Sequence, residues 1–181
     1  MARASRTALK YLLGYPADTM SQVEQLIASN GLGDWLLKKY PDSHGIRTDK
    51  ALFDYVLELK QSYLRGAELL AKVTFDSKLH VVQSALGTHT TVSRVQGSRL
   101  KSKREIRIAA LFKDVPAEFL KMITVHELAH LKERAHDKAF YQLCRYMEPN
   151  YHQLEFELRL YLTYLEESGT RLWGPETLAV V

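Results

Sequence analysis

Apolar positions in the first 70 residues recur every three or four residues, a spacing that predicts amphipathic helices. Turn-forming residues such as Pro16 and Gly31 separate the runs. On this basis we expect helices over four stretches: 5–15, 18–30, 33–40 and 49–70. The pattern therefore predicts a helical N-terminal extension comprising residues 1–70.

The spacing of apolar residues changes after residue 71. β-Branched residues become frequent, and turn formers divide them into short runs, which is typical of strands. Four strands are expected, at 72–75, 79–84, 88–95 and 105–112. Because Gly87 and Gly97 fall at turns between them, we expect a small antiparallel sheet.

Helical spacing returns from residue 117 onwards. Pro116 suits the first position of a helix, and neither glycine nor proline occurs between Ala117 and Arg134. Asp137 is expected to cap a further helix over 138–147, and a last helix is expected to end at Gly169, before a loose tail at 170–181. The whole pattern predicts an α+β fold.

The helix that starts near Ala117 carries the sequence His126-Glu127-Leu128-Ala129-His130. Residues four apart project from the same face of a helix, so the two imidazoles can bind one metal ion. The carboxylate of Glu127 can then reach a water molecule bound to that metal. A solvated helix face with two histidines is the alternative interpretation, but the apolar residues before His126 on the same face favour a metal site.

A catalytic zinc site needs a third protein ligand. His136 is the leading candidate, but on an unbroken helix it would face away from the other two imidazoles. The helix must therefore end or bend between Glu133 and Ala135. Two alternatives stay open at this stage: Glu133 itself as the third ligand, or a distant acid at Glu155 or Glu157.

The segment from His126 to Phe140 resembles the YgjP-like family of predicted metal-dependent hydrolases, which is grouped with the SprT-like and WLM zincins. The segments Glu148-Pro149-Asn150-Tyr151 and Ile106-Arg107-Ile108-Ala109 are also similar to that family, whereas Gln96-Gly97-Ser98-Arg99 matches only in part.

This resemblance implies a zincin-like domain over residues 71–181, with the small sheet packed on the HExxH helix. It implies Zn²⁺ held by His126, His130 and His136, with Glu127 as the general acid and base. The implied function is a zinc-dependent metallopeptidase that uses a metal-activated water. A donor to the developing oxyanion is also expected, and Arg94, Tyr151 and His152 are candidates.

Composition and hydropathy indicate what kind of protein carries this site and where it is expected to act. An apolar share of 46% in 181 residues is ample for a core, and the single cysteine, Cys144, is expected to be buried. No run of about 18 apolar residues and no secretory signal is present, so we expect a cytoplasmic protein without a membrane partner.

Peptides or proteins are the expected substrates. The net charge of +4 is modest, but residues 94–107 hold six basic side chains against one acid and could contact phosphates. One alternative is therefore a SprT-like, DNA-associated protease that uses this region. The other is a non-enzymatic interaction module with a structural metal.

Overall fold

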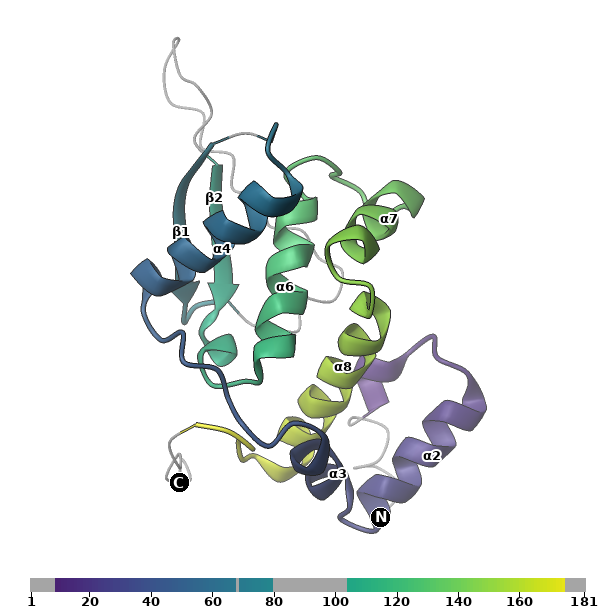
Figure 1. Ribbon diagram of the computed structural model, residues 1–181. Coiled ribbons are helices and arrows are strands. Elements are labelled where there is room, and N and C mark those ends of the chain that lie inside the picture. The colour runs from purple at the N-terminus through teal and green to yellow at the C-terminus, as the bar shows by residue number, and fades with distance from the viewer. Residues whose placement is uncertain (1–8, 68, 80–103, 175–181) are drawn as a thin grey trace. The chain divides into compact units, whose positions relative to one another are not determined.

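The computed structural model describes residues 9–67, 69–79 and 104–174 (Figure 1). Helices predominate over a two-stranded sheet within these residues, so the fold is mixed α+β, as predicted. The elements in chain order are η1 (Leu9–Leu12), α2 (Ala17–Ala28), α3 (Leu32–Lys39), α4 (Asp49–Tyr63), β1 (Leu70–Asp76), β2 (Arg104–Ala109), η2 (Ala110–Lys113), α6 (Ala117–Ala129), α7 (Lys138–Met147) and α8 (Tyr151–Ser168).

The chain divides into two compact units. One, the sheet unit, comprises Gly45–Lys113 and Leu120–Tyr151, and the other, the helical unit, comprises Met1–His44, Asp114–Phe119 and His152–Val181. Each unit draws on residues from both sides of residue 70. The division into an extension over 1–70 and a domain over 71–181 therefore stays a prediction.

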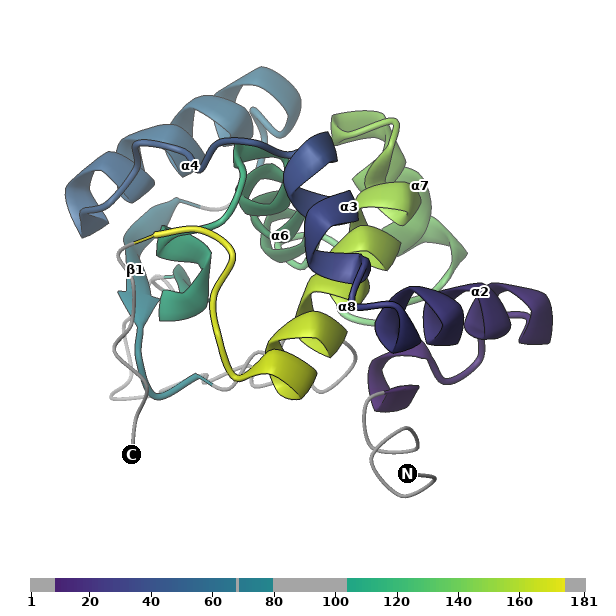
Figure 2. The same cartoon turned by 90° about the horizontal axis from the view of Figure 1, so that it is seen from below.

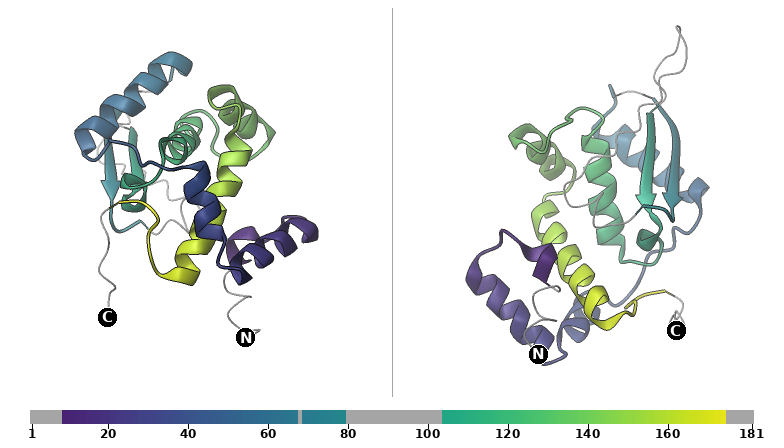
Figure 3. Two further views of the ribbon diagram at one scale, coloured as in Figure 1. Left: turned by 60° about the horizontal axis from the view of Figure 1, so that its bottom comes forward. Right: turned by 180° about the vertical axis from the view of Figure 1, so that it is seen from behind.

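The two strands of the sheet unit are parallel. Val73 pairs with Ile106 and Phe75 with Ile108, and the arrowheads of both strands point to the same end (Figure 3, right). The expectation of an antiparallel sheet was wrong for this pair. Alternation of side chains identifies a strand but not its direction, which depends on the path of the connection. A parallel pair needs a connection of about a dozen residues or more, and residues 77–103 are long enough.

The predicted strand at 88–95, and all of 79–84 except its first residue, lie outside the described residues. The strand expected at 105–112 is shorter, because β2 ends at Ala109 and continues as the 3-10 helix η2. Val73, Ile106 and Ile108 are buried, whereas Glu105 and Arg107 are exposed, so the alternation along β2 separates core from solvent.

Helix α4 lies against β1 in the sheet unit. Thr48 caps its first turn by accepting a hydrogen bond from the amide of Ala51 at 3.2 Å. The carboxylate of Asp49 accepts a hydrogen bond from the amide of Phe75 on β1 at 2.9 Å. The helix ends at Tyr63 rather than at residue 70, because the chain must turn before it enters β1.

The connections bring one end of each of four elements to the same side of the sheet unit. Helix α4 leads directly to the start of β1, β2 runs parallel to β1, and α6 runs back along β2 (Figure 1). The C-terminal ends of α4 and α6 and the starts of β1 and β2 therefore lie at one end of the sheet unit, at the top of Figure 1. We call this the upper end.

The helical unit is organised around α8, with α3 beside it (Figure 2). Glu157 of α8 is fully buried, and its carboxylate accepts hydrogen bonds from the side chains of Lys39 and Tyr40. The side-chain amide of Gln153 donates a third hydrogen bond to it at 2.6 Å. Burial and this hydrogen bond to Glu157 raise the pKa of the Tyr40 phenol far above its ordinary value. These contacts tie the end of α3 to α8.

The residues that follow α8 are better ordered than the sequence predicts. Gly169 has a φ of 68° and ends the helix, as expected for a glycine at that position. Trp173 is only 5% exposed, and its indole N–H donates to the carbonyl of Tyr40 at 2.8 Å. The expected loose tail is therefore packed as far as Trp173, and residues 175–181 lie outside the described residues. Among the described helices, none has the length and apolar character needed to cross a bilayer.

Candidate metal centre

Helix α6 presents two imidazoles on one face. His126 lies in its last turn and is 5% exposed, and His130 follows the last helical residue and is half-buried. The amide of His130 donates to the carbonyl of His126 at 3.3 Å, so the helical geometry persists as far as the second histidine. As a result, the two Nε2 atoms are 3.2 Å apart.

The chain leaves the helix immediately after His130. The amides of Leu131 and Lys132 donate to carbonyls three residues earlier, at 3.1 and 3.0 Å, which is the tighter hydrogen bonding of a 3-10 turn. Helix α6 therefore ends at Ala129, before the expected region between Glu133 and Ala135. Among the described residues other than glycine, only Asn30 has a positive φ. The backbone of Glu133 is therefore not left-handed, and the turn at this position does not require a glycine.

This early turn brings His136 back to the other two histidines. Its Nε2 atom lies 3.2 Å from that of His126 and 3.1 Å from that of His130. The next residue, Asp137, caps α7 by accepting a hydrogen bond from the amide of Phe140 at 3.1 Å. The predicted cap and the predicted helix 138–147 are both confirmed.

The triangle of Nε2 atoms has the dimensions of a metal site. Zinc–nitrogen bonds of about 2.0–2.1 Å in tetrahedral geometry place the ligand atoms about 3.3–3.4 Å apart. The observed separations of 3.1–3.2 Å are close to that value. Within the described part of the chain, these three histidines are the group of potential metal ligands that lie close enough together to hold an ion.

The tautomer of His130 also suits a metal. Its Nδ1 atom lies 2.9 Å from the carbonyl oxygen of Glu133, and because a carbonyl can only accept, the proton must be on Nδ1. In the neutral ring, Nε2 then carries a lone pair directed at the triangle. Glu133 therefore orients His130 through its backbone carbonyl. Among the described residues, its carboxylate is not part of the group that could hold a metal ion.

His126 has a side-chain partner on its other nitrogen. Its Nδ1 atom is 2.7 Å from the hydroxyl of Tyr151, which is 1% exposed. The two rings are nearly parallel, with an interplanar angle of 20°. Sequence reasoning considered Tyr151 only as a donor to substrate and missed this contact with the candidate ligand. The spacing between Tyr151 and His126 in the sequence gives no indication of this contact, because the fold brings the two residues together.

The turn that carries Tyr151 is itself anchored to α6. The carboxylate of Glu148 lies 2.6 Å from the ammonium of Lys121 and accepts a hydrogen bond from the amide of Asn150 at 3.0 Å. The amide of Tyr151 donates to the carbonyl of Glu148 at 3.0 Å. Because Glu148 is buried, this arrangement holds Tyr151 at a defined distance from α6.

Phe140 closes one side of the cluster. The centroid of its ring lies 5.0 Å from that of His126 and 4.6 Å from those of His130 and His136. The phenyl ring is fully buried, so it keeps water away from this side of the imidazoles. An apolar surface at this point strengthens electrostatic interactions at the centre.

Glu127 follows His126 on α6 and is half-buried. Loss of solvation on burial raises the pKa of its carboxyl group to about 7. A carboxylate with a pKa near neutrality can exchange protons at physiological pH, as a general base requires.

The other predicted site residues lie elsewhere. Glu155 is paired with Arg159 at 2.8 Å, and Glu157 has the partners described above, so both serve the helical unit. Arg94 and most of the basic region 94–107 lie outside the described residues. Within the described part of that region, Arg107 lies near Asp76 at 3.5 Å and Glu105 at 3.7 Å.

Comparisons with known proteins match the part of the chain that carries the three histidines. Residues 68–161 match the family described as YgjP-like, metallopeptidase domain, and the match includes the three histidines, Glu127 and Tyr151. A curated relative, named UTP pyrophosphatase, from Escherichia coli (strain K12), is 58% identical over 157 residues, which are 87% of this chain and 94% of the relative. The comparison with solved structures found no match.

Proposed function

The chain belongs to the YgjP-like family, and from this premise we propose that it is a metal-dependent hydrolase that converts UTP to UMP and pyrophosphate. The observation that supports metal-dependent hydrolysis is the convergence of three imidazole Nε2 atoms within 3.2 Å of one another. The choice of UTP rests on the 58% identity to a UTP pyrophosphatase over nearly the whole of both chains.

We infer that His126, His130 and His136 hold the metal ion and that this ion is zinc. Three neutral nitrogen ligands suit zinc, and a catalytic zinc site typically has three protein ligands and one open position. When bound, the ion supplies a Lewis acid and lowers the pKa of water in the open position. The same assignment implies a zincin-like packing of α6 against the sheet.

Glu127 acts as the general base in this proposal. Its carboxylate accepts a proton from the water that attacks the α-phosphorus of UTP. The bond between this phosphorus and the α–β bridging oxygen breaks, and pyrophosphate leaves with that oxygen. Tyr151 acts through His126 as a positioning residue, because its hydroxyl determines how that ring faces the metal.

Peptide-bond hydrolysis is the second candidate function. It is favoured by the description of the family as a metallopeptidase domain and by the pairing of β2, which among the described strands has only β1 as a neighbour. An extended peptide could add to the other edge of β2, and Glu127 could then transfer a proton to the leaving amine. A reaction on either substrate is compatible with the expected cytoplasmic location.

Replacing Glu127 by glutamine tests the proposal. We expect the Glu127→Gln variant to lose at least a hundredfold in kcat for UTP while it retains about one metal ion per chain, because only the base is removed. The matched control is Glu118→Gln, which alters an exposed carboxylate in the first turn of the same helix and should remain within about twofold of the wild type.

The assay compares UTP and a peptide library with the metal-loaded protein, and it identifies UMP and pyrophosphate by chromatography. Cleavage of peptides without release of pyrophosphate would replace the first candidate by the second. If Glu127→Gln retains full activity on the substrate that is cleaved, Glu127 is not the base.

A further inference from the structure

The turn between α6 and α7 connects two of the candidate metal ligands, His130 and His136, and it carries two cationic side chains. Lys132 and Arg134 both lie in this turn, and both are exposed. Helix α6 ends at the upper end of the sheet unit, so the turn begins there (Figure 1). Lys132 follows His130 by two residues, and Arg134 precedes His136 by two.

Hydrogen bonds fix the backbone of this turn. The amides of Lys132 and Glu133 donate to the carbonyl of Ala129 at 3.0 and 2.9 Å, and the carbonyl of Glu133 accepts from Nδ1 of His130 at 2.9 Å. At the far end of the turn, Asp137 caps α7. The two cationic side chains therefore project from a backbone of defined position, which lowers the cost of ordering them around a ligand.

The contact between Glu133 and His130 limits how far Arg134 can lie from the three imidazoles. The peptide bond of the Glu133 carbonyl leads directly to the nitrogen of Arg134. Bond lengths, together with the 2.9 Å contact, place the Cα atom of Arg134 at most about 8 Å from Nε2 of His130. An extended arginine side chain spans about 7 Å, so the guanidinium of Arg134 can reach an anion bound at the Nε2 triangle.

Neither cation has a side-chain partner among the described residues. No carboxylate in this part of the chain lies within 4.0 Å of Lys132 or Arg134, and neither side chain donates a hydrogen bond there. By contrast, Lys121 of α6 is paired with Glu148 at 2.6 Å. The donors of Lys132 and Arg134 are therefore available to a ligand.

The proposed substrate requires cationic groups in addition to the metal. A nucleoside triphosphate carries several negative charges, and a divalent ion held by neutral imidazoles compensates only part of them. Enzymes that cleave such substrates commonly use lysine or arginine side chains to bind the remaining phosphates. The turn that connects His130 to His136 supplies both kinds of side chain.

We propose that Arg134, assisted by Lys132, binds the β- and γ-phosphates of a nucleoside triphosphate and the pyrophosphate that is formed from them. This inference rests on the proposed function and adds to it a location for the leaving group. The planar guanidinium of Arg134 can make two parallel hydrogen bonds to phosphate oxygens, and the ammonium of Lys132 adds a second positive charge at the same turn.

Calorimetric titration of the metal-loaded protein with inorganic pyrophosphate tests the subsite. We expect Arg134→Gln to weaken pyrophosphate binding at least fivefold and Lys132→Gln about threefold, because each variant loses a charged donor. Arg134→Lys should recover part of the loss, since it keeps the charge but not the planar fork. The metal content measured after each titration checks that pyrophosphate has not removed the ion.

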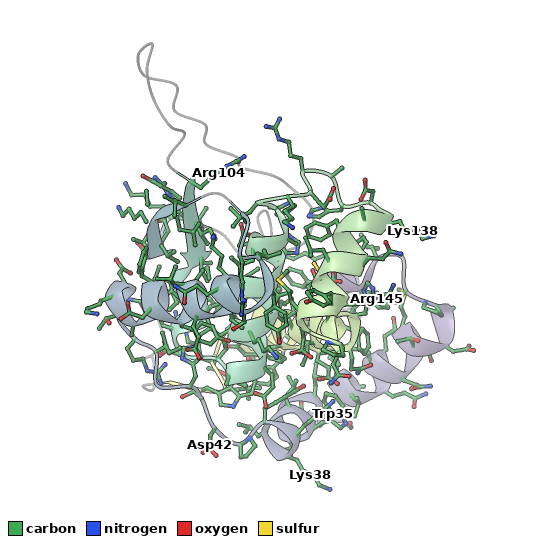
Figure 4. The ribbon with its side chains drawn as sticks, turned by 45° about the horizontal axis from the view of Figure 1, so that its top comes forward. Trp35, Lys38, Asp42, Arg104, Lys138 and Arg145 are labelled. Carbon is green, nitrogen blue, oxygen red and sulfur yellow. The ribbon has the colours of Figure 1, made fainter. Side chains whose placement is uncertain are left out.

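Arg145→Gln is the matched control. Figure 4 shows Lys138 at the start of α7 and Arg145 further along the same helix. Arg145 is exposed like Arg134 but lies about two helical turns beyond the start of α7. Its replacement removes the same charge, and we expect pyrophosphate binding within twofold of the wild type. Equal weakening in Arg134→Gln and Arg145→Gln would show only an effect of net charge and would overturn the subsite.

Two further measurements separate a phosphate subsite from a disturbed metal site. UMP lacks the β- and γ-phosphates, so its affinity should stay within twofold of the wild type in Arg134→Gln. The dissociation constant for zinc, measured by competition with a chelator, should also stay within twofold. If UMP or zinc binding weakens as much as pyrophosphate binding, Arg134 acts through the turn and not on the leaving group.

Hydrolysis of UTP, measured in parallel, distinguishes failure of this inference from failure of the proposed function. Pyrophosphate binding that depends on Arg134 in a protein that does not hydrolyse UTP would support an anion subsite and reject the activity. Hydrolysis of UTP with unchanged pyrophosphate affinity in Arg134→Gln would support the activity and reject the subsite.

Discussion

The hydroxyl of Tyr151 and the carbonyl of Glu133 are the groups that orient two of the candidate metal ligands. Each contacts the Nδ1 atom of a histidine, at 2.7 and 2.9 Å, and so holds that ring with its Nε2 atom at the triangle. The carbonyl of Glu133 can only accept, so it also keeps the proton of His130 on Nδ1. Contacts of this kind increase the affinity of a site because the rings need not be reordered when the metal binds.

Removing the hydroxyl of Tyr151 should therefore weaken the metal site. We expect Tyr151→Phe to raise the dissociation constant for zinc about 10- to 100-fold, measured by competition with a chromophoric chelator. Tyr146→Phe is the matched control, because Tyr146 is 64% exposed and should leave the affinity unchanged. Equal affinities in the two variants would show that the hydroxyl of Tyr151 does not position His126.

Sequence reasoning identified His126, Glu127 and His130 because their spacing refers only to the geometry of a helix. It assigned His136 less directly, since a ligand six residues further on depends on where the helix ends. The contact with Tyr151 could not be predicted from the sequence, because it depends on which elements pack together.

At the scale of elements, the centre depends on how α6 stops and α7 starts. Helix α6 ends at Ala129, and the 3-10 turn that follows lets His136 return to the histidines of α6. The cap at Asp137 then fixes the start of α7 one residue after His136. The third imidazole is therefore held between a helix end and a helix start.

Loss of this cap should affect both stability and metal binding. We expect Asp137→Ala to lower the free energy of unfolding of the metal-free protein by about 1 kcal/mol and to weaken zinc binding, because His136 is no longer held. Urea unfolding and chelator competition measure the two effects. The control is Asp54→Ala, which removes an exposed ion pair to Lys50 and should cost less than about 0.5 kcal/mol. An Asp137→Ala variant as stable as this control would contradict the role of the cap.

At the scale of the whole molecule, a metal ion at the three histidines would link α6 to the segment that leads into α7. A ligand that binds only the folded protein stabilises it by about 4 kcal/mol at a free concentration a thousandfold above its dissociation constant. The metal-loaded protein should therefore be distinctly more stable than the metal-free protein.

Removal of the metal by a chelator should accordingly lower Tm by about 10 °C, given the size of the chain. Differential scanning calorimetry before and after dialysis against the chelator measures this change, and added zinc should reverse it. In His136→Ala the chelator should have a much smaller effect, because a ligand is missing. An unchanged Tm in wild-type protein that has demonstrably lost its metal would exclude a stabilising site at these histidines.

The sequence by itself determined the features that depend on neighbouring residues: the helical spacing of His126 and His130, the cap at Asp137, the burial of Cys144 and the mixed α+β character. Local periodicity and capping act over a few residues, so they can be recognised without knowledge of the fold.

The tertiary structure decided what depends on contacts between distant segments. The parallel pairing of β1 with β2 reflects the path of a long connection, and the burial of Trp173 reflects a hydrogen bond to Tyr40. The meeting of Tyr151 with His126 has the same origin. Each arises from packing, in which residues far apart in the chain share one environment, and no pattern of neighbouring residues encodes that environment directly.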